Sequence, residues 1–188
     1  MATCDMSRSG DRGLTVWLTG LPGSGKTTSA DYLLHDLEDA GVFSASLDGD
    51  ALRVGVSADL GFSDADRDEN VRRAGEVALL LASQGAVVVV SLVSPRRAAR
   101  EAVRDRHLEQ SITFLEVYVA APLEVCEARD PKSLYRRARE GSLKHMTGVD
   151  DPYEPPLRPD LVLATDTAPP AETGSTLATA VRAIIRSA

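Results

Sequence analysis

The sequence predicts an α/β fold in which helices cover both faces of a parallel sheet. Short apolar runs alternate with longer amphipathic segments along the chain, which is the pattern of such folds. The run at residues 86–91, Ala-Val-Val-Val-Val-Ser, is apolar and rich in β-branched residues, as expected for a strand buried on both faces. A glycine-rich turn at residues 20–25 separates the first apolar run from the first amphipathic segment.

Each predicted strand is a short apolar run, and each predicted helix is a segment with apolar residues at helical spacing. The strands are expected at residues 14–19, 42–47, 86–91, 113–119 and 161–164. The helices are expected at residues 27–40, 69–84, 95–107, 122–129 and 175–185. Polar, turn-rich loops are expected at residues 57–68 and 165–174.

A single domain suits the length of 188 residues, because single cores usually split only beyond roughly 250 residues. Residues 1–12 are polar and are expected to form a disordered leader, so that the domain spans residues 13–188. Residues 130–154 combine basic side chains with glycine and proline breaks. This composition predicts a mobile lid that contains a short helix.

The charge and cysteine content narrow the class of partner and the compartment. The net charge is −7, whereas a general nucleic-acid binder carries a basic excess. No apolar run approaches 18 residues, so no transmembrane helix is predicted. The only two cysteines, Cys4 and Cys126, imply no disulfide framework and favour a cytoplasmic location. We therefore expect a small-molecule substrate, with neither nucleic acid nor membrane as partner.

The glycine-rich turn matches the phosphate-binding pattern G-x-x-x-x-G-K-[ST] in full, between a predicted strand and a predicted helix. In such a loop, backbone N–H groups and the positive end of the helix dipole face phosphate oxygens. Lys26 neutralises the β- and γ-phosphates, and the Thr27 hydroxyl can ligate Mg²⁺. The motif therefore predicts an ATP·Mg²⁺ site made by Gly20, Leu21, Pro22, Gly23, Ser24, Gly25, Lys26, Thr27 and Thr28.

Two carboxylates, Asp48 and Asp50, follow the second predicted strand, in the crevice where α/β sheets bind ligands. Phosphoryl transfer to a hydroxyl needs a group that orients it and accepts its proton, and carboxylates that hold Mg²⁺. A small-molecule kinase with Lys26, Asp48 and Asp50 as catalytic residues is therefore predicted, with Thr27 and Asp48 as metal ligands. Taken alone, Asp48-Gly49-Asp50 fits a functionless Asx–Gly turn equally well.

Further motifs follow in order and resemble those of the adenylylsulfate (APS) kinase family. They lie at residues 60–63, 66–73, 75–78, 94–95, 116–118, 122–127, 129–132, 134–135 and 147–154. The resemblance implies a kinase-type P-loop NTPase fold, a three-layer α/β/α arrangement with a five-stranded parallel sheet and a mobile lid. It also implies a homodimer that transfers the γ-phosphate of ATP to the 3′-hydroxyl of APS.

The resemblance implies roles for individual residues. Asp50 contacts the acceptor hydroxyl as a base or orienting group, and Lys132 of the lid reaches toward the phosphates. Phe62 stacks on the acceptor adenine, and Arg129 packs near the ATP base. The other expected acceptor contacts are Arg53, Arg67, Asn70, Val93, Ser94, His145 and Met146.

The departures from the family pattern lie on the acceptor side. The family carries an aromatic residue before Thr-Gly in the lid, where this chain has His145 and Met146. Methionine can cover a ring but loses the ring-on-ring geometry, worth ~0.5–1.5 kcal/mol. Ala51 replaces the usual asparagine, and Arg96 the usual tyrosine. A kinase acting on another nucleotide or nucleoside derivative stays open, as does a non-catalytic nucleotide-binding module, which the intact Lys26 disfavours.

Overall fold

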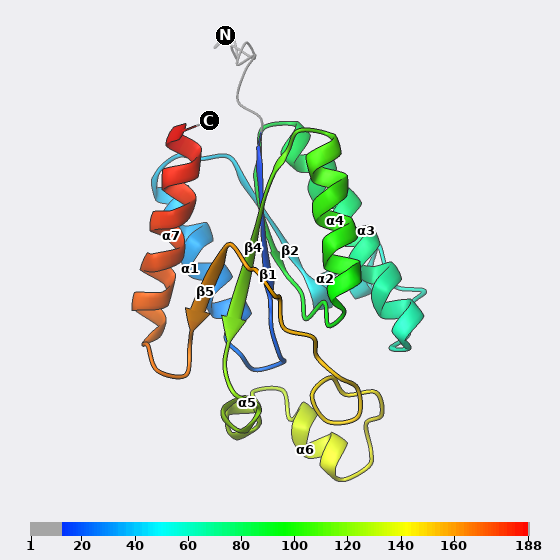
Figure 1. Cartoon of the computed structure of the whole chain (residues 1–188). Coiled ribbons are helices and arrows are strands. Elements are labelled where there is room, and N and C mark those ends of the chain that lie inside the picture. The colour runs from blue at the N-terminus through cyan, green and yellow to red at the C-terminus, as the bar shows by residue number, and fades with distance from the viewer. Residues whose placement is uncertain (1–12, 188) are drawn as a thin grey trace, which may run out of the picture.

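The computed structural model describes residues 13–187, and the expected leader at residues 1–12 lies outside them. Figure 1 shows a central sheet between two layers of helices, with two short helices beyond one end of the strands. The sheet has five parallel strands in the order β2–β3–β1–β4–β5. The predicted three-layer α/β/α fold with a five-stranded parallel sheet is confirmed.

Strands and helices alternate along the chain. The strands are β1 (Leu14–Thr19), β2 (Ser44–Asp48), β3 (Val87–Ser91), β4 (Thr113–Ala120) and β5 (Leu161–Ala164). The helices are α1 (Lys26–Asp39), α2 (Gly49–Val54), α3 (Asp64–Ser83), α4 (Arg97–Glu109), α5 (Leu123–Arg129), α6 (Leu134–Arg139) and α7 (Pro170–Ser187). Between residues 13 and 187, none of the helices is long and apolar enough to cross a membrane.

Helix α2 lies directly after the predicted strand at residues 42–47, where the sequence analysis predicts no helix. The Asp48 side chain caps this helix by accepting a hydrogen bond from the Asp50 backbone N–H at 2.9 Å. A Cβ on Gly49 would lie 2.9 Å from Leu92, so glycine allows the helix to start close to the sheet. As a result, Asp50 stands on the first turn of a helix rather than on extended chain.

Two further helices begin earlier than predicted. Helix α3 begins at Asp64 because Ser63 and Asp66 form a reciprocal capping box, so residues 64–68 are helical rather than a loop. Helix α7 begins at Pro170, inside the loop predicted for residues 165–174. Proline suits the first turn of a helix, where its missing N–H has no helical partner to lose.

Alternate residues of each inner strand face opposite helix layers, which gives the molecule two cores. In β1, Val16 and Leu18 join the apolar cluster under α1 and α7, while Trp17 joins the cluster under α3 and α4. In β3, Val89 and Val90 divide in the same way. Figure 1 shows these helix pairs on opposite sides of the sheet. Burial on both faces explains why these strands are continuous apolar runs.

The carboxyl ends of all five strands meet at one edge of the sheet. In Figure 1 this is the lower edge, below which α5 and α6 lie. The strand order places the loop after β1 between the loops after β3 and β4. The glycine-rich loop, α2 and the loop after β3 therefore all start from this edge, where α/β folds form their ligand crevices.

Gly174 lets α7 pack closely against α1. A Cβ at this position would lie 2.3 Å from Cγ of Tyr32 and 2.8 Å from its Cβ. We expect Gly174→Ala to lower the Tm, because overpacking costs about 1–3 kcal/mol while alanine gains only about 1 kcal/mol in helix propensity. Thermal unfolding followed by circular dichroism measures this change.

The matched control is Ser175→Ala, at the exposed neighbouring position of the same helix. It gains helix propensity without a new contact, so it should keep or raise the Tm. A Gly174→Ala protein at least as stable as the wild type would contradict the packing described for this helix pair.

Candidate active site

A cleft of about 1090 Å³ opens at the carboxyl edge of the sheet. It is larger than the roughly 300–1,000 Å³ typical of a pocket for one small ligand. Its walls come from the glycine-rich loop, α2, the start of α3, the loop after β3, and the lid, residues 130–154. All predicted site residues line it except Gly20, Leu21 and Ser24. One cavity therefore brings together the predicted ATP and acceptor residues.

The loop at residues 20–25 turns so tightly that glycine is needed at several positions. Gly23 and Gly25 have φ values of 77° and 99°, in the left-handed region. A Cβ on Gly20 would lie 2.5 Å from the Val119 carbonyl oxygen. The first N–H groups of α1 have no helical partner, and together with the helix dipole they favour a phosphate group at this position.

Lys26, the first residue of α1, is nearly buried, with 9% of its surface exposed. Its Nζ donates hydrogen bonds to the carbonyl oxygens of Gly20 at 3.0 Å and Leu21 at 2.9 Å. Burial lowers the pKa of Lys26 to about 8, since desolvation disfavours the charged form. Within residues 13–187 the ammonium has no carboxylate at ion-pair distance. A bound polyphosphate would supply the missing negative charge.

Thr27 and Asp48, the predicted metal ligands, both line the cleft. Hydroxyl and carboxylate oxygens are the donors that Mg²⁺ prefers, and this ion usually keeps several waters and binds substrate phosphates. The part of the chain that the structure describes contains no group of three or more metal-ligating His, Cys, Asp or Glu side chains. The residues present thus fit an Mg²⁺ ion held largely by nucleotide and water.

Two arginines and an exposed ring form a patch on the side of the cleft where the acceptor is predicted to bind. The Arg53 guanidinium lies 4.4 Å from the centroid of the Phe62 ring, and that of Arg67 lies 5.7 Å from it. Arg53 donates to the Gly61 carbonyl at 2.7 Å, and Arg67 donates to the carbonyl oxygens of Phe62 and His145. Burial lowers the pKa of both guanidiniums. Phe62 is 54% exposed, so its ring is available for stacking.

Asn70 and Ser94 lie deeper in the same cleft. Asn70 is 4% exposed, and its Oδ1 has no hydrogen-bond partner among the described residues. Because buried polar atoms are rarely left unpaired, this oxygen is suited to bind a ligand group. The Ser94 hydroxyl accepts from Trp17 Nε1 and donates to Thr19 Oγ1, both at 3.1 Å. These bonds favour Ser94 as part of the pocket wall beside Val93.

The lid contacts both sides of the cleft. The Lys132 ammonium pairs with the Asp50 carboxylate of α2, and this hydrogen bond raises the pKa of Lys132. The Tyr135 hydroxyl donates to the Pro22 carbonyl at 2.9 Å, which joins α6 to the glycine-rich loop. Lys132 thus lies beside the predicted base, with the phosphate loop also lining the same cavity.

Met146 lines the cleft but is only 5% exposed. It packs in the small apolar cluster of the lid with Cys126, Tyr135 and Ala138. The neighbouring His145 is exposed, and its imidazole lies 3.6 Å from the Asp151 carboxylate. Met146 therefore supports the lid from inside, and His145 is the more accessible of the two residues predicted to cover the acceptor base.

Arg129 lies beside a segment that the sequence does not mark as functional. Its guanidinium donates to the Thr165 carbonyl at 2.6 Å, and the Thr165 hydroxyl donates to the Ser24 carbonyl, also at 2.6 Å. Residues 165–170 line the same end of the cleft. They follow a weak strand and carry no recognisable motif, so a single sequence gives no signal that would find them.

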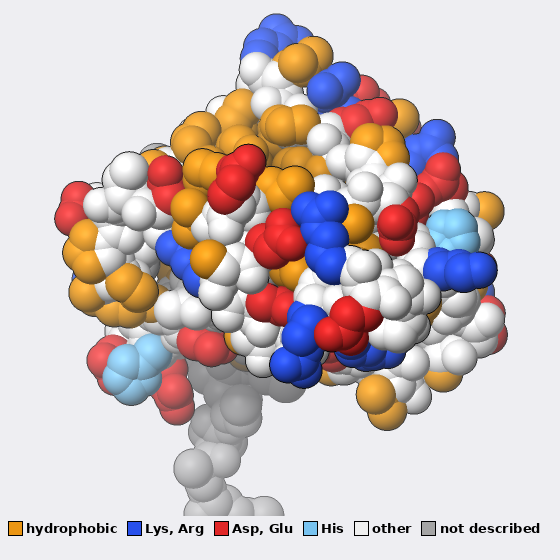
Figure 2. Space-filling view, turned by 90° about the horizontal axis from the view of Figure 1, so that it is seen from below, with side chains coloured by type: hydrophobic (Ala, Val, Ile, Leu, Met, Phe, Trp, Pro, Cys, Tyr) orange, Lys and Arg blue, Asp and Glu red, His pale blue; other side chains and the backbone are white. Residues whose placement is uncertain are grey.

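Figure 2 views the molecule from the end where α5 and α6 lie, and acidic and basic side chains are interspersed on this face. Cations that contact the cleft, such as Lys26, Arg53 and Arg67, come from separate elements. Phosphate binding at this site therefore depends on individually placed cations rather than on a broad basic surface.

Comparison with known proteins links this cleft to one family. The sequence model of the family described as adenylylsulphate kinase matches residues 12–164. An adenylyl-sulfate kinase of Synechococcus sp. (strain JA-3-3Ab) is 54% identical over 156 residues, which cover 83% of this chain and 86% of the relative. One from Paraburkholderia xenovorans (strain LB400) is 51% identical over 165 residues, which cover 86% and 88%.

A solved structure is similar over the same region. The Mycobacterium tuberculosis APS kinase CysC in complex with AMPPNP and APS has a TM-score of 0.85 and 46% sequence identity, and the match covers 89% of this chain and 97% of that chain. The family match includes the glycine-rich loop, α2, the start of α3 and the whole lid. The chain belongs to the adenylylsulphate kinase family.

Proposed function

We propose that the protein is an ATP-dependent adenylylsulfate kinase that phosphorylates the 3′-hydroxyl of adenosine 5′-phosphosulfate. The observation that carries the proposal is the single cleft, which joins Lys26 to Asp50 and to the patch formed by Arg53, Phe62 and Arg67. Family membership and the relative solved with AMPPNP and APS support the donor and the acceptor.

On the donor side, Lys26 and the free N–H groups of α1 hold the polyphosphate of ATP. The transition state of phosphoryl transfer spreads negative charge over the γ-phosphoryl oxygens, so fixed cations lower its free energy. Burial of the Lys26 ammonium strengthens this interaction, because little water screens it. Thr27 and Asp48 would hold Mg²⁺, which when bound neutralises part of the phosphate charge.

On the acceptor side, Asp50 orients the ribose hydroxyl and accepts its proton. In the free protein the Asp50 carboxylate is paired with the Lys132 ammonium, and this pair must separate before Asp50 can contact the hydroxyl. A bound phosphate offers the Lys132 ammonium an alternative partner. Substrate binding thus frees the base and moves a positive charge toward the transferred group. The arginine pair with Phe62 holds the phosphosulfate and adenine, and the lid over the cleft limits hydrolysis of ATP by water.

A kinase for another nucleotide acceptor is the second candidate. It is favoured by Met146, which packs inside the lid where the family pattern has an aromatic residue. The homodimer implied by the resemblance and the cytoplasmic location favoured by the cysteine content belong to the main proposal; light scattering and cell fractionation test them.

Purified protein with ATP, Mg²⁺ and APS should yield one 3′-phosphorylated product for each ATP consumed. Mass spectrometry identifies the product, and Lys26→Met, which lacks the ammonium, is the inactive control. A panel of nucleotides and nucleosides should show weaker turnover than APS. Background turnover of APS beside clear turnover of another acceptor would select the second candidate instead.

Asp50→Asn should lower kcat by about 10²–10⁴-fold, the usual contribution of a positioned general base. The KM for ATP should change less than about twofold, because the phosphate loop is intact. Asp105→Asn, which changes an exposed carboxylate on α4 outside the cleft, is the control and should keep full activity. Full activity of Asp50→Asn would exclude its role as base.

ATP affinity should weaken as the pH rises above about 8, where the free protein loses the proton of Lys26. The pKa of Lys26 in the folded protein is about 8, below its ordinary value of 10.5. Between pH 8 and pH 10.5 the unfolded chain therefore holds a proton on Lys26 that the folded protein has lost, so the free protein becomes more stable as the pH rises while phosphate binding becomes weaker. Titration calorimetry in buffers of different ionisation enthalpy measures both the Kd and the proton uptake. The Lys26→Arg variant stays charged over this range, so its ATP affinity should not depend on pH. A wild-type Kd for ATP that stays constant from pH 7 to 9.5 would contradict the prediction.

A further inference from the structure

We propose that Arg100 is a positioning residue that sets the shape of the acceptor pocket. The inference rests on the proposed function for the reaction it serves. Arg100 lies on α4 and is only 1% exposed, and its side chain does not line the cleft. Any effect on the reaction must therefore pass through the groups that the guanidinium holds.

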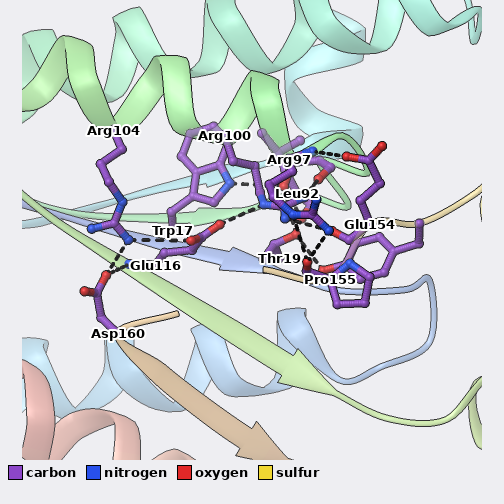
Figure 3. Close-up of polar contacts among 12 residues, drawn as sticks. Trp17, Thr19, Leu92, Arg97, Arg100, Arg104, Glu116, Glu154, Pro155 and Asp160 are labelled. Carbon is purple, nitrogen blue, oxygen red and sulfur yellow. Dashed lines mark hydrogen bonds and ion pairs between the residues drawn. The ribbon is translucent and has the colours of Figure 1, made fainter. Parts of the chain in front are cut away.

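The guanidinium joins three segments that are distant in sequence. Its Nε donates to Glu116 Oε1 at 2.7 Å, its Nη1 to the Ser94 carbonyl at 2.6 Å, and its Nη2 to the Glu154 carbonyl at 2.7 Å. Figure 3 shows Arg100 between Glu116 and Glu154, while the dashed contacts to Pro155 come from the neighbouring Arg97. Ser94 belongs to the acceptor wall after β3, and Glu154 ends the lid. One rigid planar group thus fixes the spacing between wall and lid.

The segment that Arg100 holds has an unfavourable backbone. Ser94 has a φ of 40°, a conformation that persists in a non-glycine residue only where the surroundings determine it. Trp17 and Thr19 bond its hydroxyl, and Thr19 also donates to the Val93 carbonyl at 2.8 Å. The guanidinium bond is the one that fixes the Ser94 carbonyl. Without this hydrogen bond the peptide group after Ser94 can change its orientation, and the acceptor wall can then change its shape.

The end of the lid, beside Arg100, is held in place by further contacts. Glu154 N–H donates to the Pro95 carbonyl at 2.9 Å, and its carboxylate accepts from the Arg97 N–H at 2.8 Å. The Arg100 guanidinium also lies 5.8 Å from the centroid of the Tyr153 ring. The last residues of the lid therefore dock on the start of α4, directly beside the strained serine.

A purely structural role is the competing explanation, since Arg100 is part of a larger ion network. Glu116 also lies 3.5 Å from Arg104, which pairs with Asp160 at 2.6 Å. The network therefore contains two positive side chains on α4, Arg100 and Arg104, and two negative ones, Glu116 on β4 and Asp160 just before β5. Arg104 shares the network but has no contact with Ser94 or Glu154, so comparison of the two arginines separates positioning from support.

The test uses two variants and one control. Arg100→Lys keeps the charge but loses the planar fork, and Arg100→Met/Glu116→Met removes the buried pair without leaving one charge unpaired. For both, the KM for APS should rise about tenfold, as for the loss of a charged hydrogen bond, while the KM for ATP and kcat stay within about threefold. Arg104→Met should leave both KM values unchanged. Wild-type APS kinetics in the Arg100 variants, or an equal rise in Arg104→Met, would overturn the inference.

Amide hydrogen exchange of the ligand-free proteins tests the same point without turnover. The backbone amides of residues 92–94 and 153–154 should exchange at least about tenfold faster in the Arg100 variants and at the wild-type rate in Arg104→Met. If the wild type does not phosphorylate APS, the proposed function fails but this comparison still decides the role of Arg100. Unchanged exchange in both segments would then refute it.

Discussion

The close approach of the glycine-rich loop to the end of β4 and to the middle of α5 is the constraint on which the site depends. The loop passes so near the Val119 and Cys126 carbonyl oxygens that a side chain at Gly20 or Gly23 would collide with them. This approach buries Lys26 against the loop's own carbonyls and gives it an unusually low pKa. A charge held in this way interacts strongly with phosphate because water is already excluded.

The second organising feature is that the lid and the acceptor wall share their supports. Residues at the start of the lid contact Asp50 and the glycine-rich loop, whereas its end docks on α4 beside Ser94. The cleft is thus bounded by a segment anchored at both ends. The Lys132 ammonium of the lid is paired with the Asp50 carboxylate before substrate arrives, so its binding to phosphate is an exchange of partners, whereas Lys26 has only carbonyl partners and awaits the phosphate charge. Such an exchange links occupancy of the donor side to the state of the base.

The features predicted from sequence are those encoded locally. The run at residues 86–91 and the glycine-rich motif predicted a buried strand and a phosphate-binding loop, since each needs only its own residues. Helix α2 and the start of α3 depend on caps by Asp48 and Ser63, which a polar, turn-like composition conceals. The Arg100 network was out of reach, because its partners are 16 and 54 residues away and its arginine resembles any basic residue of a surface helix.

The bond between Trp17 and Ser94 has a practical consequence. Trp17 is the only tryptophan in the chain, it is fully buried, and its indole N–H donates to the hydroxyl in the acceptor wall. Indole emission responds to the polarity and hydrogen bonding around the ring. The protein therefore carries a built-in optical probe at this wall, and stopped-flow intensity changes can time its rearrangement without any label.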